Sequence, residues 1–174
     1  MHRFQRILVF FVFLILFTVI YDFGTMNEVE KTDAEKFIED FNEIIHEIDS
    51  IGIFLHNLAI ALPMFIPGVG ILWGFFSSWS TGYAFAALES IKPSLSSIDP
   101  LKLLYFTPFG LLELTAYSIA MSRSFLLMYK IIKKISLKHD LVIIFIEIII
   151  TTVLLLLGGL VEDYMLMSLP DIDL

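Results

Sequence analysis

The sequence predicts an all-α fold: a polytopic transmembrane helix bundle of about five spans, with an external acidic amphipathic helix. Of the 174 residues, 57% are hydrophobic and only 17% are charged, and the mean hydropathy is +0.85. A soluble domain of this size has too little interior to bury so many apolar side chains. They also fall in nearly uncharged blocks, at 7–21, 51–76, 103–121 and 141–161. Because lipid accepts such surfaces, the lipid bilayer is the first expected partner.

The net charge of −8 comes largely from one segment. Residues 28–49 hold nine acidic residues against two lysines, a balance of −7. Since the sequence has no basic patch of the nucleic-acid-binding type, we expect no nucleic-acid partner. The absence of cysteine excludes disulfides, thiolate metal ligands and cysteine nucleophiles.

The first predicted element is an N-terminal signal-anchor helix in residues 1–21. Basic residues precede an uncharged run, a pattern that signal peptides and retained anchors share. Asp22 and Gly24 follow the run, and an Ala-x-Ala cleavage pattern is missing. We therefore expect a retained helix from about Phe4 to Tyr21.

Residues 22–50 are expected to lie outside the membrane and to form the acidic helix. Thr32 and Glu35 have the spacing of a capping box at its start. Apolar residues then recur at helical spacing: Ala34, Phe37, Ile38, Phe41, Ile44, Ile45 and Ile48. The acidic face is either a docking surface for a cationic partner or, as charge runs more often are, a solvated face.

Residues 51–174 form the expected membrane helix bundle. The block 51–90 is about twice the ~20 residues that cross a bilayer, and helix-breaking residues lie near its centre: Pro63, Pro67, Gly68 and Gly70. This predicts spans at 51–66 and 69–90 joined by a tight turn. A re-entrant hairpin, in which neither arm crosses fully, is the alternative.

Two more spans are predicted, from about Leu101 to Met128 and from about Leu141 to Leu160. Four lysines lie between them: Lys130, Lys133, Lys134 and Lys138. Because positive charge near span ends marks the cytoplasmic side, we expect a multi-pass protein of the cell membrane with a cytoplasmic N-terminus.

Small residues recur every fourth position in the third predicted span: Gly70, Gly74, Ser78, Gly82, Ala86 and Ser90. Such a ridge lets another helix approach closely in lipid. The ridge serves either packing inside the bundle or a seam with a second copy or another membrane subunit.

One ionisable residue, Glu113, is expected near mid-membrane, about a dozen residues into the fourth span. It could bind a proton or a cation, or be held by a hydrogen bond to His56 or Asn57 of the second span. Tyr117 lies one turn further along the same face. Arg123 near the inner end of this span is expected to snorkel toward water.

The sequence gives no sign of an enzyme. Its four histidines are scattered, and neither a His-Glu-x-x-His nor a nucleophile-elbow pattern occurs. We therefore expect no catalytic residues, no metal site and no cofactor. A third and weaker hypothesis, an intramembrane enzyme, would require His56 and Glu113 to meet within hydrogen-bond reach.

Two fragments, at 53–62 and 108–114, resemble the stage II sporulation protein M family of integral membrane proteins. That family has an Asn-Asn pair after a phenylalanine-rich span start, a later Asn-Gly, and then Pro-His-Gly-hydrophobic-hydrophobic-Glu-Leu. Five positions match this pattern: Asn57, Gly82, Pro108, Gly110 and Glu113. His56, Thr81 and Phe109 depart from it.

The resemblance implies a helical membrane protein of the engulfment-complex type, whose founding members act with peptidoglycan-degrading partners. A function that needs the histidine of the motif cannot work identically here, because Phe109 replaces it. The expectation carried over is narrower: a non-enzymatic membrane scaffold or accessory subunit that works with other membrane protein subunits or as a homo-oligomer. The alternative is a small carrier or channel that uses Glu113 as its proton or cation site.

Overall fold

The structure, a computed structural model, describes residues 3–45, 49–138 and 140–168. Within these ranges all regular secondary structure is helical, as predicted. The helices are α1 (Arg3–Thr25), α2 (Lys31–Ile45), α3 (Ser50–Ala61), η1 (Leu62–Phe65), α4 (Val69–Ile91), η2 (Pro93–Ser97), α5 (Pro100–Phe106), α6 (Pro108–Ile132) and α7 (Asp140–Ser168).

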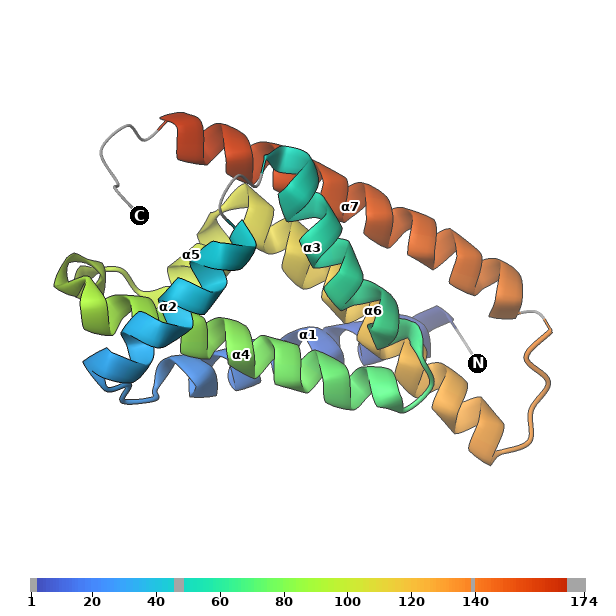
Figure 1. Cartoon of the computed structure of the whole chain (residues 1–174). Coiled ribbons are helices and arrows are strands. Elements are labelled where there is room, and N and C mark those ends of the chain that lie inside the picture. The colour runs from blue at the N-terminus through green and yellow to red at the C-terminus, as the bar shows by residue number, and fades with distance from the viewer. Residues whose placement is uncertain (1–2, 46–48, 139, 169–174) are drawn as a thin grey trace.

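The helices form two groups, α1 with α4 and α3 with α7, and α6 connects these groups (Figure 1). Helices α1 and α4 lie side by side along one edge, and α7 lies along the other. Helix α6 packs on all three of them, and α3 packs on α7. The start of α1, the turn after η1 and the loop after α6 lie toward one end of the molecule, which we call the basic end; α2, η2 and the end of α7 lie toward the other (Figure 1).

Helices α1 and α4 are parallel and approach closely through the ridge of small residues. All five ridge positions from Gly70 to Ala86 are buried. Ser78 Oγ donates a hydrogen bond of 2.6 Å to the Phe17 carbonyl. A Cβ atom on Gly82 would lie 2.1 Å from the Tyr21 carbonyl oxygen, so this crossing needs glycine. The ridge therefore packs inside the chain.

The predicted break near the centre of 51–90 is present. Helix α3 ends at Ala61, η1 follows, and α4 begins at Val69. Gly68 has a φ of 78°, a conformation that favours glycine. The apolar stretch Ser50–Phe65 is shorter than a full membrane span. The re-entrant hairpin therefore remains an alternative for this arm of the 51–90 block.

The predicted fourth span is not one continuous helix. Helices α5 and α6 meet at an angle of 82° at Thr107, whose extended backbone is typical of a residue before proline. Pro108 starts α6, and Thr107 Oγ1 accepts the Gly110 amide at 3.1 Å. Glu113 therefore lies in the second turn of α6 rather than about a dozen residues into a straight span.

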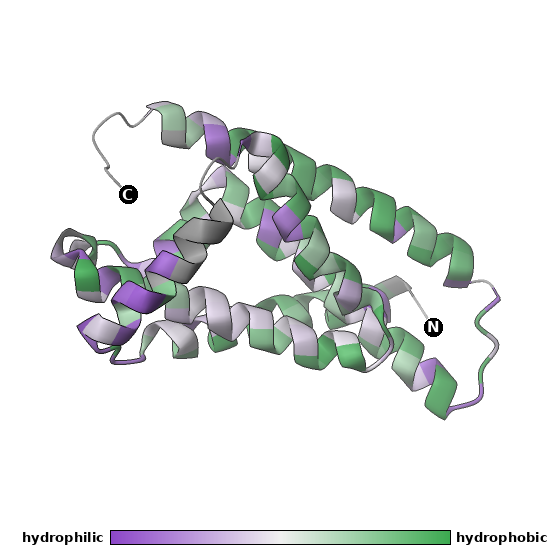
Figure 2. Ribbon diagram, viewed as in Figure 1, coloured by the Kyte–Doolittle hydropathy of each residue, from purple (hydrophilic) through white to green (hydrophobic). Residues whose placement is uncertain are grey.

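Among the residues that the structure describes, two helices are long and apolar enough to cross a membrane, α1 over Phe4–Thr25 and α7 over Asp140–Met165. A third crossing is added if the bent pair of α5 and α6 counts as one span. Figure 2 shows apolar residues along most of α7 and polar residues on α2. The protein is thus a helical membrane protein, and the expected count of five spans is not confirmed.

The acidic helix α2 packs on α4. Ala34 is fully buried, and the Phe37 ring meets the Tyr83 ring edge-on at 5.6 Å. The predicted capping box is wrong, because the amides of Asp33 and Ala34 both bond to the Glu30 carbonyl and the helix starts earlier. Ile48 of the predicted apolar stripe lies outside the described residues.

Candidate functional site

The first polar cluster contains Glu113, the ionisable residue singled out in the sequence. Asn57 Nδ2 of α3 donates a hydrogen bond of 2.6 Å to Glu113 Oε1 of α6. Asn57 is buried, whereas the neighbouring His56 side chain is exposed. Of the two residues expected as partners, Asn57 is therefore the one that bonds to Glu113.

Two more helices enclose this pair. Tyr117, one turn after Glu113, is buried, and its ring stacks on Phe17 of α1 at 5.6 Å. A Cβ atom built on Gly158 of α7 would lie 3.8 Å from Glu113 Cγ, so the Glu113 side chain packs against α7. The Glu113–Asn57 bond thus lies where α3, α6 and α7 meet, with α1 one turn away.

The residues that carry the family resemblance have clear structural roles. Asn57 and Glu113 form the bond that joins α3 to α6. Gly82 permits the close crossing of α1 and α4. Pro108 starts α6 at the sharp bend, and a Cβ atom on Gly110 would lie 2.5 Å from the Leu103 carbonyl oxygen of α5. All five positions therefore serve helix packing.

A second polar cluster is centred on Arg123, and its residues are not among the predicted site residues. Arg123 of α6 is only 2% exposed. Its Nε and Nη2 atoms donate to the two carboxylate oxygens of Glu147 on α7, a bidentate pair. Its Nη1 atom lies 3.5 Å from Asp140 Oδ1. The expectation that Arg123 snorkels toward water is therefore wrong, because the side chain is buried and α7 supplies two partners, the buried Asp140 and the half-buried Glu147.

Two further cations complete this cluster. Lys130 Nζ lies 2.7 Å from both carboxylate oxygens of Asp140. Arg6 Nη2 of α1 donates to Glu147 Oε1 at 2.6 Å. The five side chains tie together α1, α6 and α7, and three positive charges meet two negative ones, which leaves a formal charge of +1.

The spacing of these charges is a signal that the sequence does carry. Arg123 and Lys130 are seven residues apart, about two helical turns, and so are Asp140 and Glu147. In two consecutive antiparallel helices, the first cation then faces the second acid and the second cation faces the first acid. Opposite charges at matched spacing in α6 and α7 therefore predict both ion pairs.

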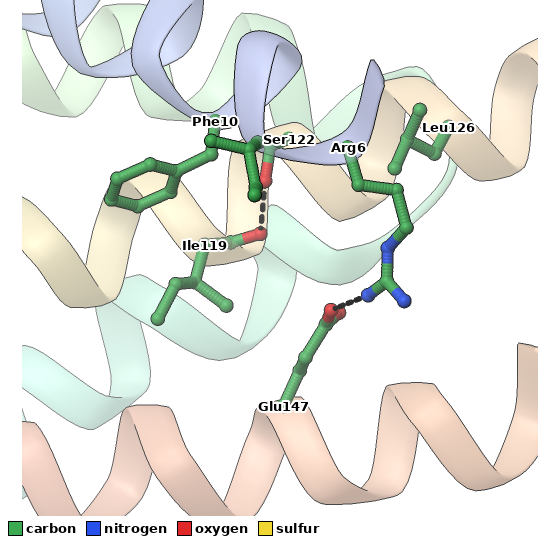
Figure 3. A pocket seen from close by; sticks show the side chains of 7 residues that line it. Arg6, Phe10, Ile119, Ser122, Leu126 and Glu147 are labelled. Carbon is green, nitrogen blue, oxygen red and sulfur yellow. Dashed lines mark hydrogen bonds and ion pairs between the residues drawn. The ribbon is translucent and has the colours of Figure 1, made fainter. Parts of the chain in front are cut away.

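A groove of about 400 Å³ opens beside this cluster, between α1, α6 and α7. Its lining residues are Arg6, Ile7, Phe10, Ile119, Ser122, Leu126 and Glu147. Figure 3 shows Arg6 reaching from α1 across the groove to Glu147 on α7. The lining does not include Glu113, so this groove does not reach the first cluster.

The chemistry of both clusters is that of interhelical bonding. Glu147 is neutralised by two arginines, and Glu113 accepts from an amide. Thr151, one turn after Glu147, is fully buried, and its Oγ1 atom has no hydrogen-bond partner among the described side chains and backbone groups. Among the described residues, no group of three or more His, Cys, Asp or Glu side chains is placed to hold a metal ion.

Comparison with known proteins gives one match. No curated protein sequence and no solved structure is similar enough to match the chain. The family model for stage II sporulation protein M matches residues 7–165, which extends well beyond the two fragments quoted above and includes most of α1 and most of α7. On this match, the chain belongs to the stage II sporulation protein M family.

Proposed function

We propose that this member of the family is a non-enzymatic integral membrane scaffold or accessory subunit of a membrane protein complex. One observation carries the proposal: Glu113 of α6 and Glu147 of α7, two carboxyl groups within apolar stretches, are both used to hold helices together. Side chains engaged in this way rigidify a bundle. A rigid bundle with a wide apolar surface suits a protein that other membrane subunits pack against.

Purification from native membranes in mild detergent tests this proposal. We expect a stoichiometric membrane partner or a homo-oligomer to accompany the chain. The matched control is Gly82→Leu, which should disrupt the α1–α4 crossing and with it the assembly. A wild-type protein that native mass spectrometry shows as a clean monomer of 19.9 kDa would contradict the proposal.

We also propose a multi-pass topology in which the basic end lies in the cytoplasm and α1 is a retained anchor. Arg6 lies near the start of α1, Lys130 in the last turn of α6, and three lysines in the loop after α6. These parts of the chain lie at the basic end (Figure 1). Positive residues near span ends favour the cytoplasmic side. The buried Phe13 and Phe17 side chains support a retained α1, because they belong to the main apolar core.

Because the chain has no cysteine, single-cysteine variants report topology without background. An impermeant thiol reagent added outside intact cells should label a cysteine at Ser96 but not one at Ser136. Labelling of both positions, or of Ser136 alone, would contradict this topology.

A carrier or channel is the second candidate, and the Glu113–Asn57 pair is the observation that favours it. An acid and an amide at a meeting point of three helices could exchange a proton or bind a cation. This function requires water to reach Glu113. Proton flux into liposomes that the wild type supports and Glu113→Gln abolishes would establish the carrier in place of the scaffold. The third hypothesis, an enzyme using His56 with Glu113, has less support, because the hydrogen bond described for Glu113 comes from Asn57 and the His56 side chain is exposed.

A further inference from the structure

The cluster around Arg123 contains one more positively charged side chain than carboxylates. Asp140 and Glu147 are matched in charge by Lys130 and Arg123. Arg123 already contacts both carboxylate oxygens of Glu147, so Glu147 keeps a buried bidentate partner without Arg6. Arg6 is therefore the surplus positive charge, and it lines the groove.

Arg6 also differs from Arg123 in its access to the surroundings. The Arg6 side chain is 37% exposed, against 2% for Arg123. An exposed surplus cation within a membrane protein favours an anionic occupant beside it. Arg6 can turn from Glu147 to such an anion without leaving the Glu147 carboxylate unpaired, because Arg123 still binds it.

The rest of the groove is suited to an apolar chain. Four apolar side chains face it from α1 and α6: Ile7, Phe10, Ile119 and Leu126. The volume of about 400 Å³ falls in the range of small-molecule sites. Arg6 lies at the start of the α1 span Phe4–Thr25, and Phe10 lies one turn deeper, at about 6 Å along the helix.

A positive charge at the membrane surface with an apolar wall directly beneath it matches the layout of an anionic phospholipid. Basic pockets between transmembrane helices commonly bind anionic lipid headgroups. Three exposed lysines at the same end, Lys133, Lys134 and Lys138, add to the positive potential. We propose that the groove between α1, α6 and α7 binds an anionic phospholipid, with its phosphate on Arg6 and an acyl chain along the apolar wall.

Native mass spectrometry of the full chain, released from nanodiscs of phosphatidylglycerol or phosphatidylcholine, tests this site. We expect the wild type to retain phosphatidylglycerol preferentially, and Arg6→Ala to weaken that preference about five-fold. Arg6→Lys should keep it. The matched control is Lys133→Ala, which removes the same charge at the same end but outside the groove and should leave the preference unchanged. An Arg6→Ala protein with the wild-type preference would overturn the proposal.

A second variant tests the apolar wall without touching the charges. Ile7 is 55% exposed and lines the groove, so Ile7→Trp should fill part of it and lower retention of both lipids. Unchanged retention would overturn the proposed position of the acyl chain. Soluble glycerol phosphate should not compete; effective competition would identify a site for a soluble phosphate instead. A wild-type dimer that Ile7→Trp converts to monomer would show that a second copy of the chain covers the groove, which also overturns the proposal.

Discussion

Replacing Arg123 by Met should unfold the bundle more readily than any other single charge removal in its cluster. The guanidinium is 2% exposed and is shared by Glu147 and Asp140, so its loss leaves these carboxylates beside an apolar side chain with only the more exposed Arg6 and Lys130 as partners. Breaking a buried ion pair from one side costs about 3–5 kcal/mol. For a chain of this size the melting temperature should fall by about 6–20 °C.

The control is Arg6→Met, which removes the same charge from the exposed side of Glu147. Because Arg6 is 37% exposed and Glu147 retains Arg123, this change should cost about 1 kcal/mol or less. The double variant Arg123→Met with Glu147→Leu also removes the carboxylate that has lost its buried partner and should recover part of the loss. Thermal melting in one detergent compares all three variants. An Arg123→Met protein that melts no lower than Arg6→Met would refute the assignment of Arg123 as the centre of the cluster.

Two further predictions concern the ridge and the first polar cluster. Gly82→Ala should destabilise the protein more than Gly74→Ala. The new Cβ atom at position 82 would lie 2.1 Å from the Tyr21 backbone oxygen, whereas the one at position 74 would lie 2.5 Å from the flexible Met121 side chain. Equal melting temperatures would contradict the close α1–α4 crossing. Glu113→Gln keeps the shape of the side chain and most of its hydrogen bonds, whereas Glu113→Leu deletes the partner of Asn57. A structural role therefore predicts normal melting and complex recovery for Gln. For Leu it predicts a loss of about 1–3 kcal/mol in the free energy of unfolding. Equal tolerance of both would exclude a structural and a proton-carrying role together.

The helix positions follow closely from local residue chemistry. The span predicted at 69–90 corresponds to α4 at Val69–Ile91, because Pro67 and Gly68 end the preceding helix. The last span, predicted from about Leu141 to Leu160, lies within α7 at Asp140–Ser168. Hydropathy alone does not reveal the bend at Thr107, because α5 is itself apolar. The proline after Thr107 does not reveal it either, because proline is also accepted at the first position of a helix.

The site was predictable in part, and the limit is one of geometry. A carboxyl group inside a membrane is energetically costly, so Glu113 indicates a hydrogen-bond partner in the second span. The sequence does not say whether His56 or Asn57 faces inward. The depth of Glu113 depends on the bend at Thr107, which moves it to the second turn of α6. Arg123 needs α7 as its partner, and only the matched spacing of charges in two helices indicates that pairing.

Photocrosslinking in native membranes shows whether this family member serves other membrane proteins as a scaffold. A photoreactive amino acid would be placed in turn at exposed apolar positions of α1 and α7, such as Phe11, Ile15, Phe145 and Ile149. The buried Leu155 is the control position, where only intramolecular products are expected. The scaffold account predicts that a contiguous set of exposed positions crosslinks in high yield to one discrete membrane protein or to a second copy of the chain. Lipid adducts alone at every exposed position would contradict it.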